Sequence, residues 1–204
     1  MSGWPPASPG PYGERGPSRF DAWWRAGAWS LGFVAVLWLI ELFDAATGNR
    51  LDVEGIRPGS SDGLAGILLA PLLHAGWGHL VANTVPLLVL GFLVLLSGVG
   101  RWAIVTTVVW IVGGLGTWFF GAPGTVHLGA SILVFGWLLY LLARGFFTRR
   151  PGQIALAVVL FVVYGSMLWG VLPGQPGISW QGHFFGALGG VIAAWGLRYE
   201  DRRP

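Results

Sequence analysis

The stretch HLGASILVFGWLLYLLARG, residues 127–145, decides the fold class of this chain. It is almost continuously apolar and has about the 20-residue length that a helix needs to cross a bilayer. A histidine and a serine nevertheless stand four positions apart at its start, His127 and Ser131. Polar side chains within membrane segments are costly and mark candidate functional sites. The stretch therefore predicts a membrane protein with reactive groups near one end of a span.

The composition extends this prediction to the whole chain. Its 204 residues are 54% hydrophobic and 10% charged, with a mean hydropathy of +0.65, whereas soluble domains are about 25% charged. The absence of cysteine excludes disulfides and thiol chemistry. All the basic residues are arginines that lie at segment ends and form no patch, which argues against a nucleic-acid partner.

Six apolar stretches approach the length of a membrane span, and they predict an all-α membrane bundle of six transmembrane helices. The predicted spans are residues 24–43, 78–97, 102–120, 127–145, 153–171 and 180–197. The long loop at 44–77 is polar in its first half and apolar, but broken by Pro71, in its second. That half predicts a partly membrane-embedded loop. The predicted membrane domain is 22–198, between a disordered Pro/Gly-rich cytoplasmic tail at 1–21 and a short cytoplasmic tail at 199–204.

The arginines predict the orientation of the bundle. If the N-terminus is cytoplasmic, ten of the twelve arginines face the cytoplasm and two face the outside. An excess of basic residues in cytoplasmic segments is the usual bias of membrane proteins. We therefore expect both termini on the cytoplasmic side.

The polar side chains of three spans fall at one depth in this arrangement. The spans at 78–97, 127–145 and 180–197 all begin at the outer surface and carry polar residues in their first turns. At 1.5 Å per residue, these residues lie within roughly 10 Å of the outer helix ends. Residues four apart share a helix face, so the members of each pair point the same way. The residues are His79, Asn83, His127, Ser131 and His183.

Small residues predict that the sixth span packs closely against the fourth. His183, Gly186 and Gly190 form one stripe, and G-x-x-x-G spacing lets two helices approach closely in lipid. If this stripe faces the fourth span, His183 comes within hydrogen-bonding distance of Ser131, about 2.6 to 3.2 Å between heavy atoms. Phe135 lies one turn beyond Ser131 on the same face.

This constellation suits acyl transfer by a serine. A serine hydroxyl becomes a nucleophile when a base takes its proton, and histidine is the usual base near neutral pH. The side chains of His79 and Asn83, with the backbone N–H of Ser131, are candidate donors to a tetrahedral oxyanion. The last five spans contain no Asp or Glu, so the predicted catalytic unit is a dyad of Ser131 and His183.

Three motifs make the chain resemble the rhomboid intramembrane serine proteases of the bacterial six-helix type. They are HAGWGHLVAN at 74–83, GAS at 129–131 and GHFFGALGG at 182–190, and the resemblance covers roughly residues 28–198. It implies that Ser131 is the nucleophile, that His183 is the base, and that oxyanion or substrate contacts come from His79, Asn83 and Gly129. The residues with implied structural roles near the site are His74, His127, Phe135, Gly186 and Gly190.

The resemblance also implies a function. The chain would be an endopeptidase that cleaves transmembrane segments of membrane proteins near the outer leaflet through an acyl-enzyme, without cofactor or metal. It would lie in a bacterial plasma membrane, with its active site opening to the extracytoplasmic side. Its partners would be the bilayer and transmembrane protein substrates, and the oligomeric state is left open. Two positions depart from the family pattern, since Ile132 replaces a glycine and Phe135 replaces a tyrosine common in relatives.

Two alternative interpretations stay open at this point. A catalytically impaired rhomboid-like protein that binds membrane clients is favoured by Ile132, which could crowd the contact between the fourth and sixth spans. A haem- or metal-binding membrane protein is suggested by the four histidines in or near the spans.

Overall fold

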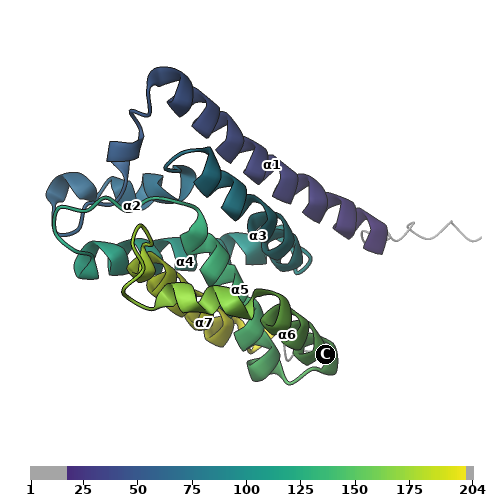
Figure 1. Cartoon of the computed structure of the whole chain (residues 1–204). Helices are drawn as coiled ribbons and strands as arrows, with labels where there is room; N and C mark the ends of the chain where they lie inside the picture. Colours follow the sequence, from purple (N-terminus) through teal and green to yellow (C-terminus); the bar gives the residue numbers. More distant parts are fainter. Residues whose placement is uncertain (1–17, 201–204) are drawn as a thin grey trace, which may run out of the picture.

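Long helices make up most of the part of the chain that the structure describes, residues 18–200. In this computed structural model the bundle is built from α1 (Arg19–Thr47), α3 (Trp77–Leu95), α4 (Val99–Phe120), α5 (Ser131–Thr148), α6 (Pro151–Tyr164) and α7 (Trp180–Leu197) (Figure 1). Shorter helical pieces fill the first loop, namely η1 (Asp52–Glu54), η2 (Ser61–Gly63), α2 (Gly66–Leu69) and η3 (Ala70–Leu72). A 3-10 segment, η4 (Gly165–Val171), continues α6. Residues 18–200 contain no β-strand.

The predicted all-helical membrane bundle is confirmed. Within residues 18–200, five helices are long and apolar enough to cross a membrane: α1, α3, α4, α5 and α6 continued by η4. The helix α7 coincides with the sixth predicted span, and its passage through the bilayer stays a prediction. The predicted N-terminal tail lies outside the described residues up to position 17, and its last residues belong to α1, which begins at Arg19.

The start of α5 differs from the prediction. The helix begins at Ser131 and not at His127, because Gly129 has a φ of +124°, a conformation that favours glycine and interrupts a helix. The Gly129 N–H donates to the Ala70 carbonyl at 2.8 Å. His127 therefore lies in an extended segment, where its backbone exchanges two hydrogen bonds with Ile56. The expectation that His127 sits in the first turn of the span is wrong.

Glycines bring α7 against its neighbours α4 and α5. A methyl group on Gly186 would collide with the Ile132 carbonyl, and one on Gly190 would collide with the Gly136 carbonyl, both in α5. Close backbone approach at small residues is the usual basis of helix association in membranes. The glycine stripe of α7 thus faces α5, and it brings the first turns of the two helices together.

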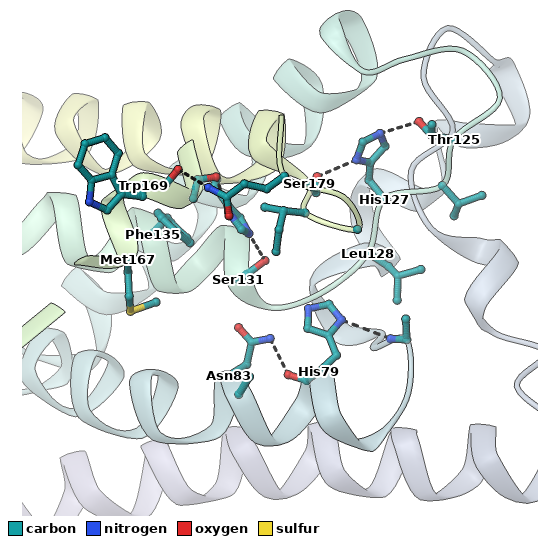
Figure 2. A pocket seen from close by; sticks show the side chains of 18 of the residues that line it. His79, Asn83, Thr125, His127, Leu128, Ser131, Phe135, Met167, Trp169 and Ser179 are labelled. Atoms are coloured by element: carbon teal, nitrogen blue, oxygen red, sulfur yellow. Dashed lines mark hydrogen bonds between the residues drawn. The ribbon is translucent and has the colours of Figure 1, made fainter. Parts of the chain in front are cut away.

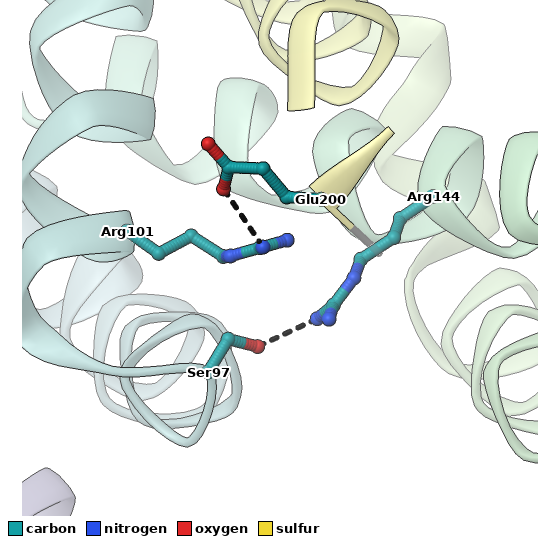
Figure 3. A network of polar contacts seen from close by, with 4 residues as sticks. All are labelled: Ser97, Arg101, Arg144 and Glu200. Carbon is teal, nitrogen blue, oxygen red and sulfur yellow. Dashed lines mark hydrogen bonds and ion pairs between the residues drawn. The ribbon is translucent and has the colours of Figure 1, made fainter. Parts of the chain in front are cut away.

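A polar network connects the helix ends that lie away from the first turns of α5 and α7 (Figure 3). Arg101, at the start of α4, pairs with Glu200 beyond the end of α7 at 3.2 Å. Arg144, near the end of α5, donates to Ser97 just after α3 at 2.6 Å. The ends of α3, α5 and α7 therefore lie on one side, and their starts, which carry the candidate site residues, lie on the other.

Candidate active site

A cavity of about 790 Å³ opens where the first turns of α3, α5 and α7 meet η4 and the loop that follows it. Figure 2 shows His79 and Asn83 approaching Ser131 from α3, with His127 and Ser179 beyond it and Met167 and Trp169 along another wall. The lining also includes Phe135 and His183. Of the residues predicted for catalysis and for oxyanion or substrate binding, Ser131, His183, His79 and Asn83 line this one cavity, whereas Gly129 is not among its lining residues.

A serine and an imidazole are paired inside this cavity. The Ser131 Oγ lies 2.9 Å from the Nε2 of His183, within normal hydrogen-bond length. The other ring nitrogen, Nδ1, lies 2.9 Å from the Gly170 carbonyl oxygen. A carbonyl can only accept, so Nδ1 carries the proton and Nε2 accepts from the serine hydroxyl. This is the tautomer that a general base for Ser131 requires.

Phe135 holds the His183 ring from one face. The two rings are stacked with centroids 4.0 Å apart and planes 13° apart. Phe135 comes from α5, one turn after Ser131, so a single helix face supplies both the serine and the aromatic platform. A phenyl ring stacks as a tyrosine ring would, but it has no hydroxyl to offer the imidazole.

Ile132 points away from the cavity into a notch made by glycines. Its side chain is 3% exposed. A methyl group on Gly113 of α4 would lie 2.5 Å from the Ile132 Cγ2, and one on Gly182 of α7 would lie 3.1 Å from its Cγ1. Because these positions are glycine, the β-branched side chain fits without separating α5 from α7.

We therefore expect Ile132→Gly to weaken the fold and to leave the reactivity of Ser131 unchanged. Removing this buried side chain leaves a cavity between α4 and α7, and the free energy of unfolding should fall by about 2–4 kcal/mol. The measurements are thermal unfolding in detergent and the rate at which a fluorophosphonate labels Ser131. A variant that is as stable as the wild type would show that the notch is not tightly packed.

His79 and Asn83 line the cavity from α3. The Asn83 amide donates to the His79 carbonyl at 3.0 Å, which fixes the Asn83 side chain and leaves its second N–H available. The Nδ1 of His79 faces the Ala75 N–H at 3.5 Å, so Nε2 is the protonated nitrogen. A methyl group on Gly129 would lie 2.7 Å from that Nε2. Gly129 thus lets the ring approach the backbone that precedes Ser131.

His74 packs against His79 and the residue before Ser131. Its side chain is buried, and its Nε2 faces the N–H of Ala130, the residue before Ser131, at 3.4 Å. Its ring lies edge-on to that of His79, with centroids 5.2 Å apart. Burial, with a smaller contribution from His79, lowers the pKa of His74 to about 3. His74 is therefore a neutral group that holds the loop entering α5.

His127 connects three segments at the edge of the cavity. The Thr125 hydroxyl donates to the Ala122 carbonyl at 2.6 Å, so it accepts from the Nε2 of His127 at 2.8 Å. The Nδ1 of His127 then accepts from the Ser179 hydroxyl at 2.7 Å. Ser179 is the N-cap residue of α7, and its carbonyl accepts the N–H of His183 at 3.1 Å. His127 thus anchors the turn that begins α7.

The stability of the protein should fall with acidification partly through His127. Burial lowers the pKa of His127 in the folded protein, whereas the unfolded chain has a pKa of about 6.5. The unfolded chain therefore binds the proton more readily, so this stability is present above about pH 6.5 and is lost as the pH falls through the folded value. We expect the unfolding temperature of the wild type to drop between pH 7.5 and 5.

The variant His127→Gln separates this contribution from that of the other histidines. It should be less stable at pH 7.5 by about 1–2 kcal/mol, because the side chain loses its two fitted hydrogen bonds. Its unfolding temperature should also depend less on pH than that of the wild type. An unchanged pH dependence would show that His127 does not take up a proton on unfolding.

The comparisons with known proteins identify the family. The fold and the cavity define a helical integral membrane protein whose polar pocket pairs a serine with a histidine. The model of the Rhomboid domain matches residues 61–200, and the chain belongs to the rhomboid family, as the sequence motifs predicted.

Similar proteins occur in several bacteria. An uncharacterized protein of Mycobacterium tuberculosis is 51% identical over 189 residues, which cover 89% of this chain and 79% of that protein. An uncharacterized protein of Mycobacterium leprae is 50% identical over 189 residues, which cover 89% of this chain and 75% of that protein. A Bacillus subtilis protein named "Putative rhomboid protease YdcA" is 29% identical over 170 residues, 81% of this chain and 84% of its own length.

Sequence reasoning missed three polar partners in the site, one of which is Thr125, the partner of His127. Gly170 contributes a backbone carbonyl, and Ser179 lies in a Gly/Pro-rich turn where a serine is unremarkable. Within residues 18–200, no group of three or more His, Asp or Glu residues is placed to hold a metal ion.

Proposed function

We propose that this protein is an intramembrane serine endopeptidase that cleaves transmembrane segments through a dyad of Ser131 and His183. The observation that carries the proposal is the 2.9 Å contact between the Ser131 Oγ and the His183 Nε2, with the opposite ring nitrogen fixed on a carbonyl. His183 takes the hydroxyl proton as Ser131 attacks a substrate carbonyl. It then gives the proton to the leaving amine, and an acyl-enzyme remains that water hydrolyses.

The groups on the α3 side suit the stabilisation of the tetrahedral intermediate. The side chains of His79 and Asn83 line the same cavity as Ser131, and the Ser131 N–H stands at the start of α5. Donors that are aimed in advance at developing negative charge are the largest contribution in many acyl-transfer enzymes. The N-terminal end of the α5 dipole adds to the same effect.

The low burial of α6 favours a route past this helix by which substrate enters. Leu160 is the one buried residue of α6, so this helix is held more weakly than α4, α5 or α7. A transmembrane substrate could enter sideways past α6 and η4, while water reaches Ser131 through the polar mouth of the cavity. In the orientation that the arginines favour, both termini are cytoplasmic and the cavity opens on the extracytoplasmic side of a bacterial plasma membrane.

A fluorophosphonate probe tests the proposal directly, because it reacts covalently with a serine only when a base activates it. We expect the wild type to be labelled and to cleave a model transmembrane substrate in proteoliposomes. Ser131→Ala should do neither, whereas Ser61→Ala, which changes an exposed serine of the first loop, should behave as the wild type. A folded wild type that is neither labelled nor active would overturn the proposal and favour the client-binding interpretation.

A further inference from the structure

The His183 imidazole has an orienting partner that is not a side chain. The sequence holds no Asp or Glu between Asp62 and Glu200, so no carboxylate from the helices of the site can accept the Nδ1 proton. The atom that stands opposite Nδ1 is the carbonyl oxygen of Gly170, at 2.9 Å. Gly170 belongs to the last turn of η4.

The local sequence leaves this carbonyl without a partner of its own. In a 3-10 helix each carbonyl accepts from the N–H three residues later. The residue three positions after Gly170 is Pro173, which has no N–H. The preceding carbonyl, of Trp169, is used twice, by the Leu172 N–H at 3.1 Å and by the Gln175 side chain at 2.9 Å. The Gly170 oxygen is therefore the acceptor that the end of η4 leaves for His183.

The close approach of η4 to the imidazole favours glycine at this position. A methyl group on Gly170 would lie 3.1 Å from the His183 Nδ1 and 3.0 Å from the Phe135 Cζ. Both distances are shorter than ordinary van der Waals contact, and both rings are held by their stack. An alanine would have to push η4 away from the imidazole or tilt the ring away from Ser131.

We propose that the Gly170 carbonyl is the positioning group of the dyad, which holds His183 in the Nδ1–H tautomer so that Nε2 accepts from Ser131. The inference rests on the proposed function for its meaning in catalysis, but the tautomer itself is a property of the resting protein. Because η4 continues α6, a substrate that displaces α6 must leave the contact between the Gly170 carbonyl and His183 in place. Otherwise the base loses its orientation.

Alanine substitutions at two glycines of η4 test the positioning role. Gly170→Ala should lower the rate of Ser131 labelling and kcat by about 10- to 100-fold, part of the contribution expected from a general base, with little change in KM. Gly165→Ala is the matched control, because the methyl group there meets only Phe161 of the preceding helical turn, at 3.6 Å. Thermal unfolding of both variants shows whether they are folded. A folded Gly170→Ala protein with wild-type labelling and kcat would overturn the inference.

Nitrogen-15 NMR of histidine-labelled protein tests the tautomer without any activity. The chain has four histidines, so the His183 resonances can be assigned from a His183→Gln variant. In the wild type at neutral pH we expect His183 as the single Nδ1–H tautomer, and in Gly170→Ala we expect a mixture of both tautomers. A predominant Nε2–H tautomer in the wild type would overturn the inference, even if Ser131 is catalytic. Failure of cleavage with the expected tautomer would instead refute the proposed function alone.

Discussion

Replacing Ser131 with alanine is expected to abolish cleavage of a transmembrane substrate, with kcat/KM falling by about 10,000-fold or more. His183→Ala should cause a loss of similar size, because the proposed mechanism requires both residues. The Ser131 hydroxyl and the His183 Nε2 are 2.9 Å apart, and without the imidazole the hydroxyl keeps its proton. The measurement is cleavage of a model substrate by purified variants in proteoliposomes.

The double variant Ser131→Ala/His183→Ala makes this prediction sharper. It should be no slower than either single variant. When two residues act as a unit, the first substitution already removes their whole contribution to the rate, and the second removes nothing more. Ser131→Ala removes one hydrogen bond, which costs about 1 kcal/mol. His183→Ala also removes the bond to Gly170 and the stack on Phe135, so thermal unfolding of all three variants is measured beside cleavage. Losses that multiply in the double variant, or a Ser131→Ala protein that cleaves as fast as the wild type, would contradict the dyad.

The convergence of the site could be predicted because it depends on regularities that a single sequence displays. His79 and Asn83 are four residues apart and line one cavity. Gly186 and Gly190 have the same spacing as the residues they approach, Ile132 and Gly136 of α5. The helices alternate in direction, which places the starts of α3, α5 and α7 at one end of the bundle.

The parts that could not be predicted depend on backbone groups and on exact helix ends. The acceptor for His183 is a backbone carbonyl, and every residue has one. In the sequence only Pro173, which has no N–H, indicates that the Gly170 carbonyl is left unpaired. The prediction that the fourth span is helical from His127 was wrong, because hydrophobic periodicity cannot detect the positive φ of Gly129. His127 was therefore given to a helix, although it lies in the extended segment that pairs with Ile56.

Ile132 shows why a departure from a family pattern is hard to interpret from the sequence alone. Taken alone, a β-branched residue after the serine suggests crowding between α5 and α7. In the structure Gly113 and Gly182, which lie on two other helices, leave the space that the Ile132 side chain fills. No local pattern links positions so far apart in the sequence, so the compensation is visible only in the packed bundle.

The second large effect is expected from Gly190→Leu, which should disrupt the contact that holds the dyad together. A side chain at this position collides with the Gly136 carbonyl of α5, and a carbonyl within a helix cannot rotate away. The variant should lose about 2–3 kcal/mol of stability through overpacking. It should also be labelled about 100-fold more slowly by a fluorophosphonate, the loss typical of an ångström-scale displacement of a catalytic group.

The matched control is Gly196→Leu, in the same helix. A methyl group on Gly196 meets no atom within 4 Å, so this variant shares the change in chain composition and helix propensity but not the collision. Its unfolding temperature and its labelling rate should stay close to those of the wild type. If both variants lose stability and reactivity equally, the effect comes from leucine in α7 generally, and the Gly190–Gly136 contact does not set the distance between Ser131 and His183. If only Gly190→Leu loses both, the packing of α7 on α5 is what brings the base to the nucleophile.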